Sequence, residues 1–100
     1  MKPVVLHSIA AAEIEDAVAY YNGVREGFGD EFRDRVEAAI RLIGSQPKAF
    51  SPCSGGYRRY VLGRPFPHSI FFIEYDDRVW VATVYDSRRK PDQWKARTPE

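Results

Sequence analysis

The feature of this sequence that most constrains its fold is a change in hydrophobic spacing near Pro47. Before that point, apolar residues recur every three or four positions in two segments, residues 8–22 and 28–43, as they do on one face of a helix. After it, residues 57–62 alternate, residues 69–75 are apolar on both faces, and residues 79–85 return after an Asp-Asp-Arg turn. The spacing therefore predicts two amphipathic helices followed by three strands.

Flanking residues set the expected limits of these elements. A β-branched run at residues 2–7 predicts a first strand, and Ser8 is expected to cap the first helix through its hydroxyl. Gly44 and Pro47 are expected to end the second helix, and residues 47–56 have the composition of a loop. The order is β-α-α-β-β-β, which predicts an α+β fold in which a helical hairpin packs on a small antiparallel sheet. One hundred residues correspond to one domain, residues 1–100.

Composition excludes several classes of protein. The net charge is only +1, far from that of a dedicated nucleic-acid binder, although residues 57–97 hold nine Lys or Arg against five acidic residues. No apolar run is long enough to span a bilayer and no signal peptide is present, so we expect a cytoplasmic protein without membrane contact. Cys53 has no partner for a disulfide, and His7 and His68 lack metal-ligand spacing. No cofactor or metal is expected.

A set of arginines is the first candidate for function. Arginine donates a planar fork of hydrogen bonds that matches a phosphate or a carboxylate. We expect the doublet at the start of residues 57–62 to meet the doublet that follows residues 79–85 at one end of the sheet, and to form a surface for a partner or substrate. Alternatively, these side chains are solvated or pair with nearby acids. The set comprises Arg58, Arg59, Arg64, Arg88, Arg89 and Lys90.

Three other side chains have alternative interpretations. His68 titrates near neutrality, so it is either a general acid or base or a structural residue at a strand start. Trp94 and Tyr85 either stack on a base or, in the case of Trp94, plug the tail onto the body of the domain.

Nearly the whole chain resembles the ParE/RelE superfamily of toxins from type II toxin-antitoxin modules, especially the ParE-like, plasmid-stabilisation branch. The order and spacing of several loose motifs carry the resemblance. They are Tyr20-Tyr21, Gly29 to Phe32, Pro47, Arg58-Arg59, Phe66-Pro67-His68, Arg88-Arg89-Lys90-Pro91 and Trp94.

The resemblance implies a toxin that causes growth arrest unless a cognate antitoxin binds it. ParE-like members block DNA gyrase, whereas RelE-like members cut mRNA in the ribosome. This chain departs from the nuclease pattern, because Ser69 stands where an arginine is usual, Asp86 where His is frequent, and His68 where Tyr is more usual. An anionic Asp86 would repel a phosphate, and it would be a weak base.

Two hypotheses for an active toxin follow, beside a third in which the chain is a toxin-like remnant that still binds its antitoxin and poisons nothing. In the favoured one the chain inhibits DNA gyrase by binding it, and Arg58, Arg59, Arg88 and Arg89 form the contact surface. In the other it is a ribosome-dependent mRNA endonuclease, in which His68 or Asp86 moves protons, Arg59, Arg88 and Arg89 hold the phosphate, and Trp94 or Tyr85 stacks a base.

Either toxin is expected to form a hetero-oligomer with its antitoxin or a homodimer. A helix of the antitoxin is expected on apolar surface around Phe71, Ile73 and Trp80.

Overall fold

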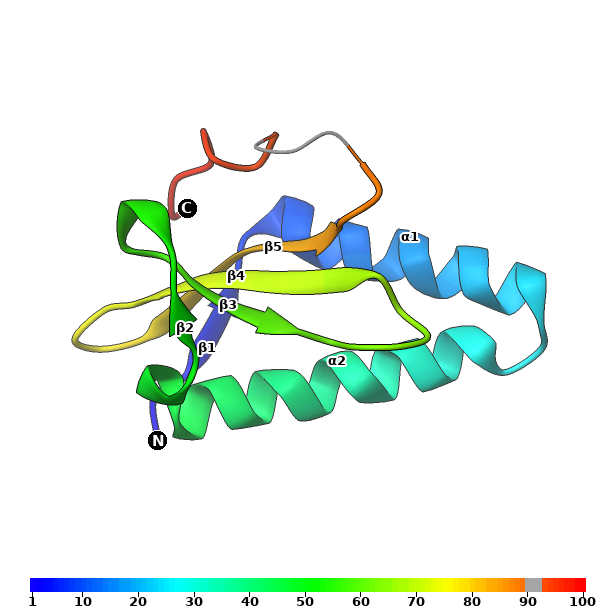
Figure 1. Ribbon diagram of the computed structural model, residues 1–100, viewed down its shortest axis with the longest axis horizontal. Helices are drawn as coiled ribbons and strands as arrows, with labels where there is room; N and C mark the ends of the chain where they lie inside the picture. The colour runs from blue at the N-terminus through cyan, green and yellow to red at the C-terminus, as the bar shows by residue number, and fades with distance from the viewer. Residues whose placement is uncertain (90–92) are drawn as a thin grey trace.

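The computed structural model describes residues 1–89 and 93–100, and it contains two long helices on one mixed sheet (Figure 1). The elements are β1 (Val4–Leu6), α1 (Ser8–Val24), α2 (Phe28–Ser45), η1 (Pro47–Ala49), β2 (Ser51–Pro52), η2 (Ser54–Gly56), β3 (Arg58–Val61), β4 (His68–Glu74) and β5 (Val79–Asp86). The α+β class and the helical hairpin on a small sheet are confirmed.

The sheet differs from the expected antiparallel one in two respects. Its strand order is β1-β5-β4-β3-β2, and β1 runs parallel to β5 while the other pairs are antiparallel. The prediction of a purely antiparallel sheet is therefore wrong, because the two helices carry the chain back so that β1 lies beside β5. Part of the expected loop also forms β2, which pairs with Arg58 and Arg59.

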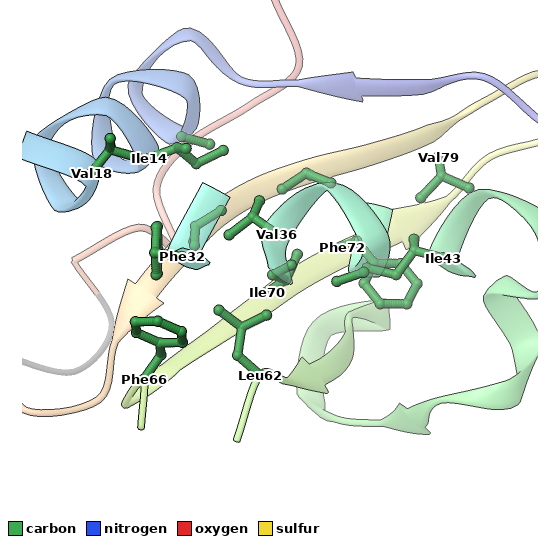
Figure 2. Packing of buried hydrophobic residues seen from close by; sticks show 14 of the residues in the cluster. Ile14, Val18, Phe32, Val36, Ile43, Leu62, Phe66, Ile70, Phe72 and Val79 are labelled. Carbon is green, nitrogen blue, oxygen red and sulfur yellow. The ribbon is translucent and has the colours of Figure 1, made fainter. Parts of the chain in front are cut away.

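The main core lies between the two helices and the sheet face that they cover (Figure 2). Phe32, Val36 and Ile43 project from α2 at helical spacing, and Ile70 and Phe72 meet them from β4; all five are at most 1% exposed. The helices approach closely at Gly29, whose backbone N–H donates to Asn22 Oδ1 at 2.7 Å. The spacing of apolar residues in the sequence thus marks the face that each helix buries.

The first helix begins differently from the prediction. His7 is the N-cap residue, and its Nδ1 accepts a hydrogen bond from the Ile9 N–H at 3.1 Å. Ser8 is already helical, and its N–H and hydroxyl both donate to the carboxylate of Glu100, at 2.8 and 2.5 Å. The prediction that Ser8 caps the helix is therefore wrong, and a carboxylate from the C-terminal segment satisfies the helix end instead.

A bulge in β5 separates its two halves. Phe72 pairs with Val81 and Phe71 pairs with Thr83, which leaves Ala82 as an extra residue. β1 pairs only with the first half of β5, from Val79 to Val81. Bulges bend a strand and re-aim its side chains. The second half of β5 therefore continues past the end of β1, and no strand among residues 1–89 and 93–100 pairs with it on that side.

Candidate functional site

The two arginine doublets do not meet. Arg58 pairs with Phe72 near the far end of β4, whereas Asp86, which precedes the second doublet, pairs with His68 at the start of β4. Four residues of β4 separate the two positions, or roughly 13 Å along a strand. The prediction that the doublets lie at one end of the sheet is wrong, because β3 and β5 both run antiparallel to β4 and therefore share a direction.

The individual arginines have different surroundings. Arg58 turns inward, and its Nη1 donates to the Phe50 carbonyl at 2.7 Å. Arg59 and Arg89 are exposed, and within residues 1–89 and 93–100 no carboxylate pairs with either. Arg64 is exposed in the β3–β4 connection, where its carbonyl accepts from Arg35 Nη2 at 2.7 Å. Lys90 lies outside the described residues.

A groove lies between α1 and the second half of β5, with a cavity volume of about 560 Å³. One face of α1 forms one wall, the end of β5 forms the opposite wall, and the C-terminal segment closes a third side. The lining residues are Glu13, Asp16, Ala17, Tyr20, Tyr21, His68, Val84, Tyr85, Asp86, Arg88, Arg89, Gln93, Trp94 and Arg97. The groove therefore gathers five of the predicted site residues: His68, Asp86, Arg88, Arg89 and Trp94.

Asp86 and Arg88, which both line this groove, form an ion pair. Asp86 Oδ1 accepts from the N–H and Nε of Arg88 at 2.9 and 3.0 Å, and Oδ2 accepts from Nη2 at 2.9 Å. The side-chain hydrogen bonds from Arg88 lower the pKa of Asp86, and the carboxylate in turn raises the pKa of the guanidinium. One edge of the Arg88 fork is thus occupied by a carboxylate of the same chain.

His68 also lines the groove and is only 6% exposed. Its ring packs edge-on against Phe32, with ring centroids 4.8 Å apart, and against Tyr21 at 6.0 Å. Burial lowers the pKa of His68 below its ordinary value of 6.5, so the imidazole is neutral at pH 7. Its Nδ1 and the Tyr21 hydroxyl are buried without a hydrogen-bond partner in the described part of the chain.

Glu13 and Arg97 cover the strandless edge of β5, and sequence reasoning gave neither of them a site role. Glu13 Oε1 accepts from the Thr83 hydroxyl at 2.7 Å and from the Val84 N–H at 3.1 Å. Arg97 pairs with Glu13 at 3.0 Å and donates to the Ala82 carbonyl at 2.9 Å. No local pattern links residues 84 positions apart. The only signal is their charge, which an ordinary surface pair shares.

The C-terminal segment is fixed to the outer face of the sheet, on the side away from α2 (Figure 1). Trp94 is 4% exposed, and it stacks on Phe71 at 4.5 Å and meets Tyr57 edge-on at 4.8 Å. Trp94 therefore anchors the C-terminal segment to the sheet, as one of its two sequence interpretations predicted. Its contact with a target or a base stays a prediction. Trp80 is 2% exposed beneath this cluster. Trp80 therefore offers little surface to a partner, and the contact of an antitoxin helix around Phe71 and Ile73 stays a prediction.

Neither a metal site nor a membrane-spanning helix is found among the residues that the structure describes. Across residues 1–89 and 93–100 no group of three His, Cys, Asp or Glu side chains is placed to hold a metal ion. Over the same residues, none of the helices combines the length and apolar character needed to cross a membrane.

Comparisons with known proteins identify the fold. No family model matches the sequence, and no curated protein matches it significantly. A chain in a solved structure of the chromosomal ParDE TA system from P. aeruginosa superposes with a TM-score of 0.74 at 16% sequence identity. The match covers 86% of this chain and 96% of that chain. The chain therefore has the fold of that protein, and the fold implied by the sequence resemblance is confirmed.

Proposed function

We propose that this chain is the toxin of a type II toxin-antitoxin module, of the ParE type, and that it arrests growth by binding DNA gyrase. The fold shared with a ParDE TA system supports the toxin role, as does the ordered set of motifs along the chain. On this proposal a cognate antitoxin binds the toxin and neutralises it, and no hydrolytic step is involved.

The Asp86–Arg88 ion pair is the observation that favours binding of a target over cleavage of RNA. Cleavage through a 2′-hydroxyl needs a base, an acid and a cation on the phosphate. Asp86 is held as an anion of lowered pKa, and it occupies one edge of the Arg88 guanidinium. His68 is neutral and almost fully buried. These features support a protein that binds its target, because binding requires neither a free base nor a free phosphate clamp.

The exposed arginines are the proposed contact surface for gyrase. Arg59 and Arg89 have no carboxylate partner in the described part of the chain, so they are available to carboxylates of another protein. Arg64 is a further exposed arginine, in the β3–β4 connection, whereas the Arg88 guanidinium is paired with Asp86. Arg58 contributes less, because its guanidinium already donates to a backbone carbonyl.

Purified components test this proposal. The chain is added to DNA gyrase in a supercoiling assay, and in parallel to ribosomes translating a defined mRNA. Wild type is expected to inhibit supercoiling and leave the mRNA intact. The double variant Arg59→Ala/Arg89→Ala should lose inhibition, while Arg41→Ala, which removes an exposed arginine on α2, should retain it. Cleaved mRNA with unaffected supercoiling would instead identify a ribosome-dependent endonuclease, with His68 as its first catalytic suspect.

A further inference from the structure

His68 and Asp86 face each other across the last two strands of the sheet. They are register partners in the antiparallel pairing of β4 with β5, so their side chains leave the same face with Cβ atoms about 4.5–5.5 Å apart. Both side chains line the groove beside α1. At this separation, rotation of the aspartate side chain is enough to bring its carboxylate to the imidazole. The pairing of the strands therefore places an acid and a base within reach of each other.

The two groups are engaged differently in the structure. Both carboxylate oxygens of Asp86 accept from the Arg88 guanidinium, at 3.0 Å from Nε and 2.9 Å from Nη2. His68 Nδ1 is buried, and it has no hydrogen-bond partner within the residues that the structure describes. A neutral ring tolerates this, but an unpaired buried charge costs far more than an unpaired buried dipole. A protonated His68 therefore requires a carboxylate.

The charged and titratable groups that surround the imidazole in the groove leave Asp86 as that carboxylate. They come from α1, from the end of β5 and from the C-terminal segment, and they are Glu13, Asp16, Tyr20, Tyr21, Asp86, Arg88, Arg89 and Arg97. Glu13 is already paired with Arg97 at 3.0 Å, and Asp16 is exposed. The phenols are neutral near pH 7, and the guanidiniums repel an imidazolium. Asp86 is therefore the acid placed to stabilise the protonated ring.

Acidification charges the imidazole before it neutralises the carboxylate. Burial lowers the pKa of His68 from its ordinary value of 6.5, and the hydrogen bonds from Arg88 lower the pKa of Asp86 from its ordinary value of 3.8. As the pH falls, His68 takes up a proton while Asp86 is still an anion. The new positive charge then competes with Arg88 for the same two oxygens.

From this geometry, we propose that His68, Asp86 and Arg88 form a proton-driven switch. At neutral pH the carboxylate holds the Arg88 guanidinium. When His68 takes up a proton from solvent, the carboxylate turns to the imidazolium and releases Arg88. The released fork then joins Arg89, whose guanidinium pairs with no carboxylate in the described part of the chain, as a second arginine open to an oxyanion or a partner's carboxylate. That this carboxylate belongs to gyrase rests on the proposed function.

An NMR titration of the full-length chain tests the switch. The ring signals of His68 and the Nε–H signal of Arg88 are followed from about pH 8 to about pH 5. Both are expected to change with one midpoint, and His68→Gln should abolish the change at Arg88. Asp86→Asn should lower the His68 midpoint because it removes the anion, whereas Arg88→Met should raise it because it removes a cation and leaves the carboxylate to the ring. Asp77→Asn makes the same change in the exposed turn at the other end of the β4–β5 hairpin and should leave the midpoint unchanged.

Sulfate probes the released guanidinium, because it keeps its charge over this pH range. Titrated into the chain, it should shift the Arg88 Nε–H signal and bind several-fold more tightly at pH 5.5 than at pH 7.5. In His68→Gln the affinity for sulfate should be the same at both pH values. This control separates the release of Arg88 from the general gain of positive charge on acidification.

Three results would overturn the proposal. One is an Arg88 signal that does not follow the titration of His68, including a ring that stays neutral until the chain unfolds. Another is a His68 midpoint that Asp86→Asn leaves unchanged, and the third is a sulfate affinity that does not depend on pH. None of these measurements uses gyrase or growth arrest. A chain that switches but does not inhibit gyrase would refute the proposed function and leave the switch standing, and gyrase inhibition without titration of Arg88 would do the reverse.

Discussion

Two glycines in the helical hairpin should respond in opposite ways to the same substitution. Gly29 lies where α2 crosses α1, and a Cβ there would overlap the Val18 carbonyl oxygen and approach Asn22 Cγ to 2.6 Å. Gly23 is also helical, but a Cβ there has no atom within 4 Å. Gly29→Ala is therefore expected to destabilise the protein and Gly23→Ala to stabilise it.

The magnitudes follow from packing and helix propensity. Alanine in place of glycine stabilises a helix interior by about 1 kcal/mol, which is an upper limit for Gly23 and Gly29 because both lie near a helix end. At Gly29 the overlap is with backbone, which cannot move aside as a side chain does, so overpacking costs about 3 kcal/mol. The net effect is a loss of about 2 kcal/mol at Gly29 against a gain of up to about 1 kcal/mol at Gly23.

Thermal unfolding followed by circular dichroism measures both variants. For a domain of this size, about 1 kcal/mol corresponds to a change of about 4–8 °C in Tm. Gly29→Ala should therefore lower Tm by about 10 °C, and Gly23→Ala should raise it by a few degrees. An equal or higher Tm for Gly29→Ala would refute the close helix crossing on which this reasoning depends.

Three further predictions concern the site and its surroundings. Arg97→Met removes the ion pair with Glu13, so it should reduce the free energy of unfolding by about 1–3 kcal/mol and speed amide exchange at Val84 in NMR; unchanged exchange would contradict the edge cover. Burial lowers the folded-state pKa of His68, so the unfolded chain takes up the proton first and stability should fall as pH drops below 6.5. Urea unfolding at pH 7.5 and 5.5 should show this loss, and His68→Gln should reduce it. Arg35→Met removes hydrogen bonds to the Leu62 and Arg64 carbonyls at 2.8 and 2.7 Å, and should lower the urea midpoint through a loss of about 1–3 kcal/mol; an unchanged midpoint would show that these bonds do not hold the β3–β4 connection.

Local patterns in the sequence predicted the elements well. Phe32, Val36 and Ile43 repeat at helical spacing, and the structure buries all three on the face of α2 that meets the sheet. The strand at residues 69–75 reads as covered on both faces, and β4 is indeed central, between β3 and β5. These predictions succeeded because a residue's spacing from its near neighbours decides which face it occupies.

Relations between distant segments were not accessible in the same way. The parallel pairing of β1 with β5 depends on where the helical hairpin returns the chain, and three residues of β1 carry no sign of it. The same holds for Glu13 and Arg97, whose pairing depends on where the C-terminal segment crosses the end of β5. The two arginine doublets were expected at the same end of the sheet, and this prediction was wrong. In an antiparallel meander the first and third strands run in the same direction, so the start of β3 and the end of β5 lie at opposite ends of the sheet. The sequence named His68, Asp86, Arg88, Arg89 and Trp94 as candidate site residues, but neither the groove that they line nor its helical wall was predicted.

The most direct test of the central claim is a pulse-labelling experiment after inducing this chain alone in a bacterial host, following DNA and protein synthesis minute by minute. If the chain arrests growth by binding gyrase, DNA synthesis should fall first and a DNA-damage response should follow. If protein synthesis collapses first while DNA synthesis continues, the chain acts on translation, and the gyrase proposal is wrong.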